Sequence, residues 1–177
     1  MKTSKHYMDC INNRTITEEI LEACLYSVNK RAKNHRDRAR EAEYRYRYDY
    51  YGVGINERMK MEEMYNMKDT MLETLSPVCA HYVERDYKVP SEAPYDCCET
   101  YDSYKECFLL YKIGNHTFHT PVDEDDEYYQ SFIKSGKVEE LHDFTTYGAD
   151  VSDLISMQFV KKLVRLIEIG NYTYIAA

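Results

Sequence analysis

A long helical pattern that glycine interrupts constrains the fold of this chain more than any other feature. Thr15-Ile16-Thr17-Glu18-Glu19 combines hydroxyl caps with acidic residues suited to a first turn, so we expect a helix from about residue 17. Apolar residues recur at helical spacing in its first turns and then give way to alanines among charged residues. Gly52-Val53-Gly54 ends the pattern, and Asn56 can cap a second helix. The two segments predict an antiparallel αα-hairpin.

The second helix is rich in methionine, at positions Met59, Met61, Met64, Met67 and Met71. Methionine is flexible and polarizable, so it either fills irregular gaps between packed helices or lines an adaptable binding groove. Both interpretations stay open at this point.

The second half of the chain contains a strong hairpin signal, because two β-prone runs between Phe108 and Val122 flank Gly114-Asn115. A further strand is expected over Tyr172 to Ile175, beside this hairpin.

A wide apolar face predicts a C-terminal helix over residues 151–168, with Asp150 or Ser152 at its start and Gly170 after its end. We therefore expect an α+β fold: a long N-terminal αα-hairpin, and a small antiparallel β-sheet packed by a C-terminal helix. The hairpin region takes residues 1–80 and the α+β region takes residues 81–177.

Positive charge is concentrated in the second half of the first helix. Residues 30 to 47 carry eight of the 23 Lys and Arg and only three acids, a net +5 in a chain whose net charge is −8. Several cations on one helix suit phosphates, and the aromatic planes that follow suit exposed bases. The candidate binding residues are Lys30, Lys33, Arg36, Arg38, Arg40, Tyr44, Arg45, Tyr46, Arg47, Tyr48, Tyr50 and Tyr51. The alternative is a solvated helix whose arginines pair with nearby acids and whose tyrosines pack on the second helix.

An acidic run offers a second candidate surface. It consists of Asp123, Glu124, Asp125, Asp126 and Glu127. Its carboxylates can imitate nucleic-acid phosphates and enter a basic groove on another protein, because complementary charge speeds such association. A solvated loop that keeps the protein soluble explains the same residues.

The sequence contains no catalytic or metal-binding motif. His116 and His119 lie three residues apart, so a regular strand sends them to opposite faces, and Cys97-Cys98 lacks the usual C-x2-C spacing. We expect no metal, no cofactor and no enzymatic activity, while an enzyme whose catalytic groups come from distant residues stays as an alternative class.

The chain starts without an apolar signal segment and has no run long enough to cross a membrane, so we expect a soluble, cytoplasmic protein that does not bind membranes and whose cysteines are free thiols. A long helix with a thin apolar stripe can also pair with its own copy, which gives a homodimer.

The segment LLYKIGNHTFHTPV (residues 109–122), followed by Tyr147-Gly148 and the helix from Val151, resembles small accessory proteins of phages that infect Gram-positive bacteria. Some members of that group look like anti-CRISPR proteins directed at Cas9, and the resemblance covers roughly residues 108 to 175. It implies a non-enzymatic inhibitor that binds a CRISPR-Cas effector nuclease with its guide RNA in the bacterial host and blocks target DNA engagement or cleavage. The basic helix lies outside the matching region. The alternative is a nucleic-acid-binding accessory or regulatory protein that acts through helix residues 30–47.

Overall fold

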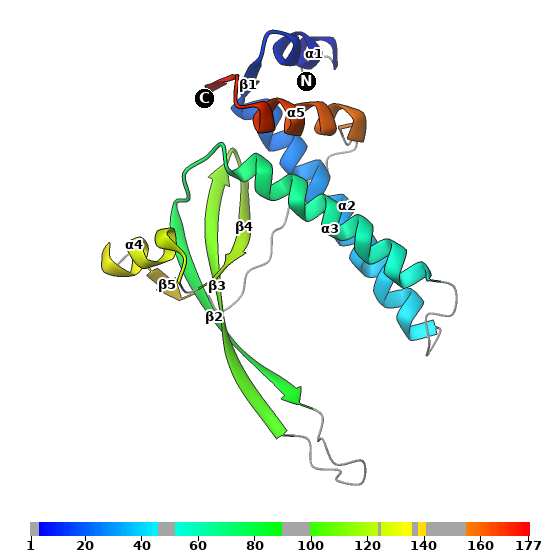
Figure 1. The fold of residues 1–177 in the computed structure, drawn as a ribbon, viewed down its shortest axis with the longest axis vertical. Helices are drawn as coiled ribbons and strands as arrows, with labels where there is room; N and C mark the ends of the chain where they lie inside the picture. The colour runs from blue at the N-terminus through cyan, green and yellow to red at the C-terminus, as the bar shows by residue number, and fades with distance from the viewer. Residues whose placement is uncertain (1–3, 46–51, 90–99, 124, 136–137, 141–154) are drawn as a thin grey trace. The chain divides into compact units, whose positions relative to one another are not determined.

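The computed structural model describes residues 4–45, 52–89, 100–123, 125–135, 138–140 and 155–177 (Figure 1). The chain forms two compact units. A helical unit comprises Met1–Ser76, Ile113–His116 and Tyr147–Ala177, and a sheet unit comprises Pro77–Lys112 and Thr117–Thr146. The C-terminal segment thus joins the N-terminal helices, which differs from the consecutive regions 1–80 and 81–177 that the sequence suggested.

The helical unit begins with helix α1 (Ser4–Asn12), strand β1 (Thr15–Thr17) and the long helix α2 (Glu18–Arg45). Thr17 caps α2, because its Oγ1 accepts a hydrogen bond from the Ile20 amide at 3.3 Å. The predicted start of this helix is confirmed.

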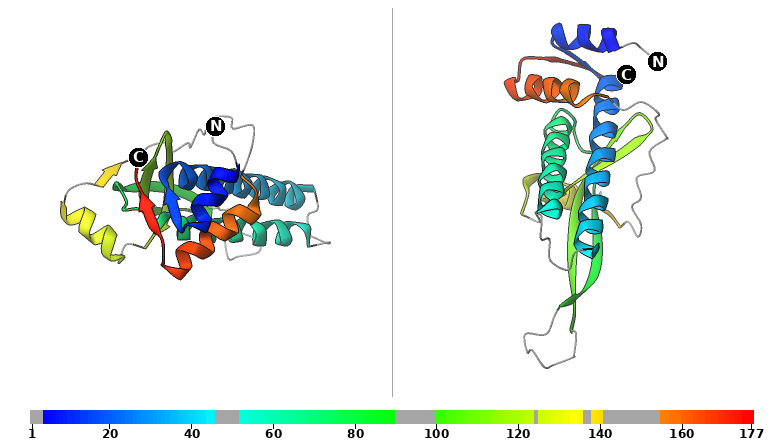
Figure 2. Two further views of the ribbon diagram at one scale, coloured as in Figure 1. Left: turned by 90° about the horizontal axis from the view of Figure 1, so that it is seen from above. Right: turned by 90° about the vertical axis from the view of Figure 1, so that its right-hand side faces the viewer.

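Helix α3 (Val53–Leu72) lies alongside α2 in both views of Figure 2, so the predicted helical hairpin is confirmed. Its start was predicted wrongly at Asn56. Gly52 takes the left-handed conformation, with φ 64°, and its carbonyl accepts from the Asn56 amide at 3.0 Å. Glycine adopts this conformation without steric cost, so the helix starts directly after Gly52 and Asn56 lies inside the first turn.

The packing face of α2 changes along the helix. Its first turns bury Ile20, Leu21 and Leu25, which are 0% exposed, whereas the second half buries only alanines such as Ala32 and Ala39. These small side chains allow close packing of the distal half, which the sequence had suggested would be poorly covered.

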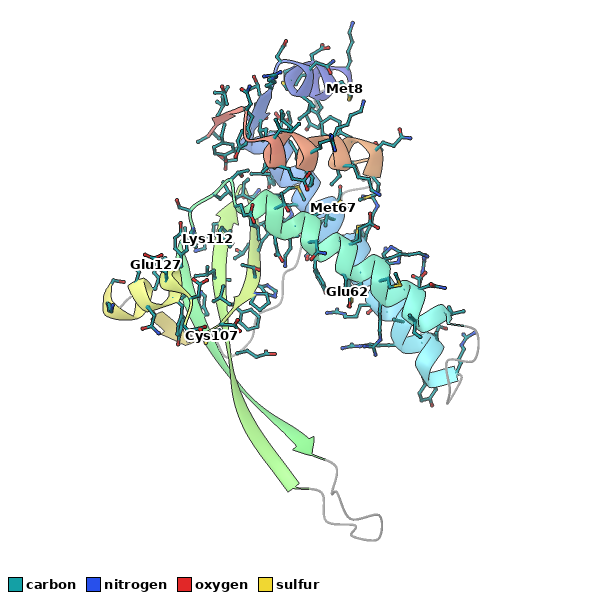
Figure 3. The ribbon with its side chains drawn as sticks, viewed as in Figure 1. Met8, Glu62, Met67, Cys107, Lys112 and Glu127 are labelled. Carbon is teal, nitrogen blue, oxygen red and sulfur yellow. The ribbon has the colours of Figure 1, made fainter. Side chains whose placement is uncertain are left out.

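The methionines of α3 serve mainly in packing. Met64, Met67 and Met71 are buried, whereas Met59 is 62% exposed (Met67 is labelled in Figure 3). The interpretation of this helix as a packing partner is confirmed for the buried three.

Helix α5 (Met157–Ile169) contacts α3 and α1, and the Tyr7 ring of α1 lies 6.1 Å from that of Phe159. Its predicted end at Gly170 is confirmed, with φ 73° at that glycine. Its predicted start at residue 151 is wrong, because the Oγ of Ser156 accepts from the Phe159 amide at 3.3 Å and caps the helix there. The expected caps Asp150 and Ser152 lie outside the described residues.

Strand β6 (Thr173–Ile175) pairs in parallel with β1, with Ile16 opposite Tyr174. The C-terminal strand is therefore present as predicted, but its expected place beside the 108–122 hairpin is wrong. A three-residue strand carries too little pattern to specify its partner.

The sheet unit contains β2 (Cys79–Val89), β3 (Thr100–Ile113), β4 (His116–Val122), α4 (Glu127–Ser135) and β5 (Val138–Glu140). The strand order is β4-β3-β2-β5, with β2 and β3 antiparallel and β5 parallel to β2. Helix α4 contacts β2 and β5, and its Tyr129 is 1% exposed. The predicted hairpin around Gly114-Asn115 is confirmed, although β3 starts earlier than residue 108 and β2 was not predicted.

The turn between β3 and β4 is held by two carboxylates at the start of α2. Glu22 accepts from the Asn115 amide at 3.2 Å and from His116 Nδ1 at 2.8 Å. Glu18 accepts from the amides of Gly114 at 3.3 Å and Ala177 at 2.7 Å.

These elements confirm the α+β class, with a long helical hairpin, an antiparallel sheet and a C-terminal helix. Helix α5 packs on helices α1 and α3, whereas the sequence predicted that it would pack on the sheet. Within the described ranges, no helix has both the length and the apolar content to cross a membrane.

Candidate nucleic-acid interface

The cations of α2 divide into three groups, and Glu57 of α3 defines the first. This carboxylate is 8% exposed and accepts hydrogen bonds from His35 Nδ1 at 2.6 Å and Lys60 Nζ at 2.7 Å. Arg38 Nη1 lies 3.9 Å away. The hydrogen bond from His35 and then that from Lys60 lower the pKa of Glu57 from 4.5 to about 2. We call these four residues the Glu57 cluster.

The Glu57 cluster links α2 to α3 through one charge-assisted hydrogen bond, from His35, and through the ion pair with Arg38, while Lys60 binds Glu57 from α3 itself. Sequence reasoning missed it, because the partner of His35 lies 22 residues away on another helix. Only the Glu57–Lys60 spacing of three was visible in the sequence. Arg38, one of the predicted partner-binding residues, instead forms an ion pair with Glu57 inside the protein.

Two further candidate arginines pair with acids on α2 itself. Arg45 pairs with Glu41 at 2.5 Å, and Arg36 Nε lies 3.8 Å from Asp37 Oδ1. All four side chains are at least 42% exposed, so these pairs are weak and a stronger anion can replace them. The predicted pairing of arginines with nearby acids is thus present for part of the segment.

The third group of cations faces solvent without a described acidic partner. Lys33 and Arg40 are exposed and, among the residues that the structure describes, neither takes part in an ion pair. Tyr44 is 90% exposed, and residues seven and four apart along a helix lie on nearly the same side. We call Lys33, Arg40 and Tyr44 the outer stripe.

The outer stripe is suited to an anionic chain with exposed rings or bases. Two cations can contact successive phosphates, and the tyrosine at the end offers a stacking plane. Lys30 also belongs to this region, with its Nζ 5.9 Å from the centre of the Tyr26 ring. The remaining predicted residues Tyr46, Arg47, Tyr48, Tyr50 and Tyr51 lie outside the described residues.

The acidic candidates do not form one uniform surface. Asp123, Asp125 and Glu127 are exposed, whereas Asp126 caps α4, because its Oδ1 accepts from the Tyr128 amide at 2.8 Å. Glu124 lies outside the described residues. Asp126 therefore has a structural role, and three carboxylates around it remain open to solvent.

The histidines considered for metal binding have other contacts. His116 bonds to Glu22, and His119 packs edge-on against Phe108 with ring centres 5.1 Å apart. Cys107 is buried, and Cys97 and Cys98 lie outside the described residues. The described part of the chain has no group of three His, Cys, Asp or Glu side chains arranged to hold a metal ion.

A shallow cavity of about 380 Å³ lies between α3 and α5. It is lined by Glu63, Asn66, Met67, Thr70, Lys161, Val164, Arg165 and Glu168, and Lys161 pairs with Glu63 at 2.8 Å. These lining side chains include no cysteine, histidine or serine. The Cys79 Sγ lies 3.1 Å from His81 Nε2 on strand β2, and neither residue is among those that line this cavity.

Comparisons with models of known protein families, with curated proteins and with solved structures found no match to this chain.

Proposed function

We propose that this chain is a non-enzymatic phage protein that binds a guide-RNA-loaded CRISPR-Cas nuclease, such as Cas9, in the bacterial cytoplasm and blocks target DNA engagement or cleavage. The outer stripe carries the proposal: Lys33 and Arg40 are exposed cations, and Tyr44 beside them is 90% exposed. Such a surface fits the phosphates and bases of a nucleic acid held in the complex.

The charge distribution of the chain supports a nucleoprotein as partner. The net charge of −8 disfavours binding of free nucleic acid across the whole protein surface. The local cations of α2 can still attract phosphate. A loaded nuclease presents both RNA phosphates and a basic channel, so it can meet the outer stripe and the exposed acids Asp123, Asp125 and Glu127. The resemblance of residues 108–175 to phage accessory proteins points in the same direction.

The test is a DNA cleavage assay with guide-loaded Cas9 and increasing amounts of the protein, with co-purification of the two at low salt. We expect inhibition near one molecule per nuclease. The double variant Lys33→Glu and Arg40→Glu should weaken binding at least tenfold. The slope of log affinity against log salt concentration should also fall by an amount that corresponds to roughly two lost phosphate contacts.

A matched control reverses two other exposed cations, Lys112→Glu and Lys162→Glu, and so changes the net charge equally. This control should bind within about threefold of the wild type, because neither lysine belongs to the outer stripe and charges outside an interface contribute little to affinity. Equal weakening by both pairs would mean that net charge alone drives binding. Absence of both binding and inhibition would contradict the proposal for Cas9.

The same outer stripe also suits a nucleic-acid-binding accessory protein without a nuclease. That function predicts direct binding of single-stranded RNA or DNA by the isolated chain, with affinity that falls as salt rises and that requires Tyr44. Titration of a labelled single strand with wild type and Tyr44→Ala separates the two functions, since the inhibitor should bind the loaded nuclease far more tightly than the strand.

A further inference from the structure

Helix α1 carries a histidine and a cysteine one turn apart on its outer side. Its inner side is fixed, because Tyr7 and Ile11 are buried and the Tyr7 hydroxyl donates to Glu19 Oε1 at 3.1 Å. His6 is exposed, and Cys10 is half-buried. Residues four apart on a helix are neighbours, so these two side chains extend from the same face of α1.

The distance between the two side chains matches two ligands of one zinc ion. Cys10 Sγ lies 3.8 Å from His6 Nε2. Thiolate sulfur lies about 2.3 Å and histidine nitrogen about 2.0–2.1 Å from zinc, so a tetrahedral angle places the two ligand atoms about 3.5–3.6 Å apart. The pair of Cys79 and His81 differs in this respect, because 3.1 Å between Sγ and Nε2 is too short for two ligands of a tetrahedral ion.

One chain supplies only half of such a site. Structural zinc sites take four ligands, and two cysteines with two histidines are a common set. In the described ranges, no group of three His, Cys, Asp or Glu side chains includes this pair. A second copy of the chain supplies an identical His6 and Cys10, and a twofold axis through the metal makes the two contributions equivalent. A single His-x3-Cys pair provides two ligands only, so it escapes a search for complete metal-binding motifs.

We propose that His6 and Cys10 form half of a zinc site, which two copies of this chain complete as a tetrahedral centre between their α1 helices. Thiolate and imidazole donors favour zinc over magnesium and calcium, which prefer oxygen ligands. Each thiol releases its proton to solvent as it binds, so the two thiolates neutralise the charge of the ion. This inference does not depend on the proposed function, because the outer stripe contains neither residue.

Titration of the full chain with zinc chloride tests the site, in the presence of a phosphine reductant that keeps the thiols reduced. We expect sedimentation velocity to show conversion of monomer to dimer that is complete near one zinc ion per two chains and that a chelator reverses. Cobalt(II) in place of zinc should give the intense visible absorption of a tetrahedral ion with thiolate ligands. Cys10→Ser and His6→Asn should each weaken zinc-dependent dimerisation at least about a hundredfold, because changes outside the ligand set alone cost about 10–100-fold.

Two matched controls separate this geometry from composition and from the other thiols. Lys5→His together with His6→Lys keeps the composition and moves the histidine away from the Cys10 side of α1, and both positions are exposed. This double variant should stay monomeric with zinc. Cys79→Ser leaves α1 unchanged, so its zinc-dependent dimer should stay within about threefold of the wild type.

A wild type that binds no zinc, or that binds zinc without forming a dimer, would overturn the proposal. So would a plateau at one zinc ion per chain. Dimerisation that Cys10→Ser and His6→Asn leave unchanged would assign the metal to other thiols and equally overturn it.

Discussion

His35 of α2 donates a hydrogen bond of 2.6 Å to the carboxylate of Glu57, which is 8% exposed on α3. This contact joins the two helices in the segment where α2 buries only alanines. The distal hairpin therefore combines close packing of small side chains with one anchored charge.

Glu57→Gln should destabilise the protein by about 1–3 kcal/mol, because it leaves the mostly buried His35 donor with a weaker acceptor and removes the ion pair with Lys60. Chemical denaturation of the two proteins measures this difference. Glu62→Gln is the control, since Glu62 lies exposed on the same helix (Figure 3) and should change stability by less than about 0.5 kcal/mol. Equal effects of the two substitutions would show that the Glu57 cluster adds nothing to stability.

The contribution of Glu57 should depend on pH. Its pKa is about 2 in the folded protein and 4.5 in the absence of its partners, so folding holds it in the charged form. The stabilisation is complete above pH 4.5 and is lost as pH falls through the interval from 4.5 to about 2. The stability difference between wild type and Glu57→Gln should accordingly narrow across this interval. If this stability difference stays constant from pH 7 to pH 3, the contribution of Glu57 comes from packing and not from its charge.

Gly114→Ala should destabilise the protein more than Gly52→Ala. Both glycines have positive φ, 54° and 64°, so alanine at either position costs about 1–2 kcal/mol of backbone strain. At Gly114 the added methyl group also meets the Glu22 carboxylate, whereas at Gly52 it meets open space. In thermal unfolding, the midpoint temperature should therefore be highest for the wild type, lower for Gly52→Ala and lowest for Gly114→Ala. Equal destabilisation by the two substitutions would mean that the Glu22 carboxylate moves aside freely.

Cys24 should resist alkylation in the folded protein. It is 0% exposed, and burial raises the pKa of its thiol to about 12, so the reactive thiolate is scarce at neutral pH. Peptide mapping after brief treatment with iodoacetamide should find Cys10 modified and Cys24 intact. Unfolding in denaturant provides the control, because both should then react. Rapid native modification of Cys24 would indicate that the core of the helical unit opens easily.

The parts of the fold that the sequence predicted correctly depend on local chemistry. Thr17 caps α2, Gly170 ends α5, and Gly114-Asn115 forms the turn of the hairpin, and each acts within a few neighbouring residues. The parts that it missed depend on distant partners. Strand β2 contains three consecutive charged residues, Glu84, Arg85 and Asp86, so it lacks a clear strand pattern, and its pairing partner β3 is distant in the sequence.

The same distinction applies to the candidate site. The excess of cations between residues 30 and 47 was visible in the composition, but which of them pair with an acid was not. Glu57 on α3 pairs with His35 and Arg38, whereas Lys33 and Arg40 form no ion pair with a residue that the structure describes. A carboxylate on one helix cannot be assigned to cations on another until the helices are paired.

The parallel pairing of Thr15–Thr17 with Thr173–Ile175 also determines when this protein can finish folding. Contacts between residues so far apart in sequence form late, because a long loop must close first. During translation, α1, β1 and α2 leave the ribosome well before the segment that completes their core. The helical unit should therefore stay incomplete until residues 155–177 have emerged, and its nascent form exposes apolar surface that chaperones recognise.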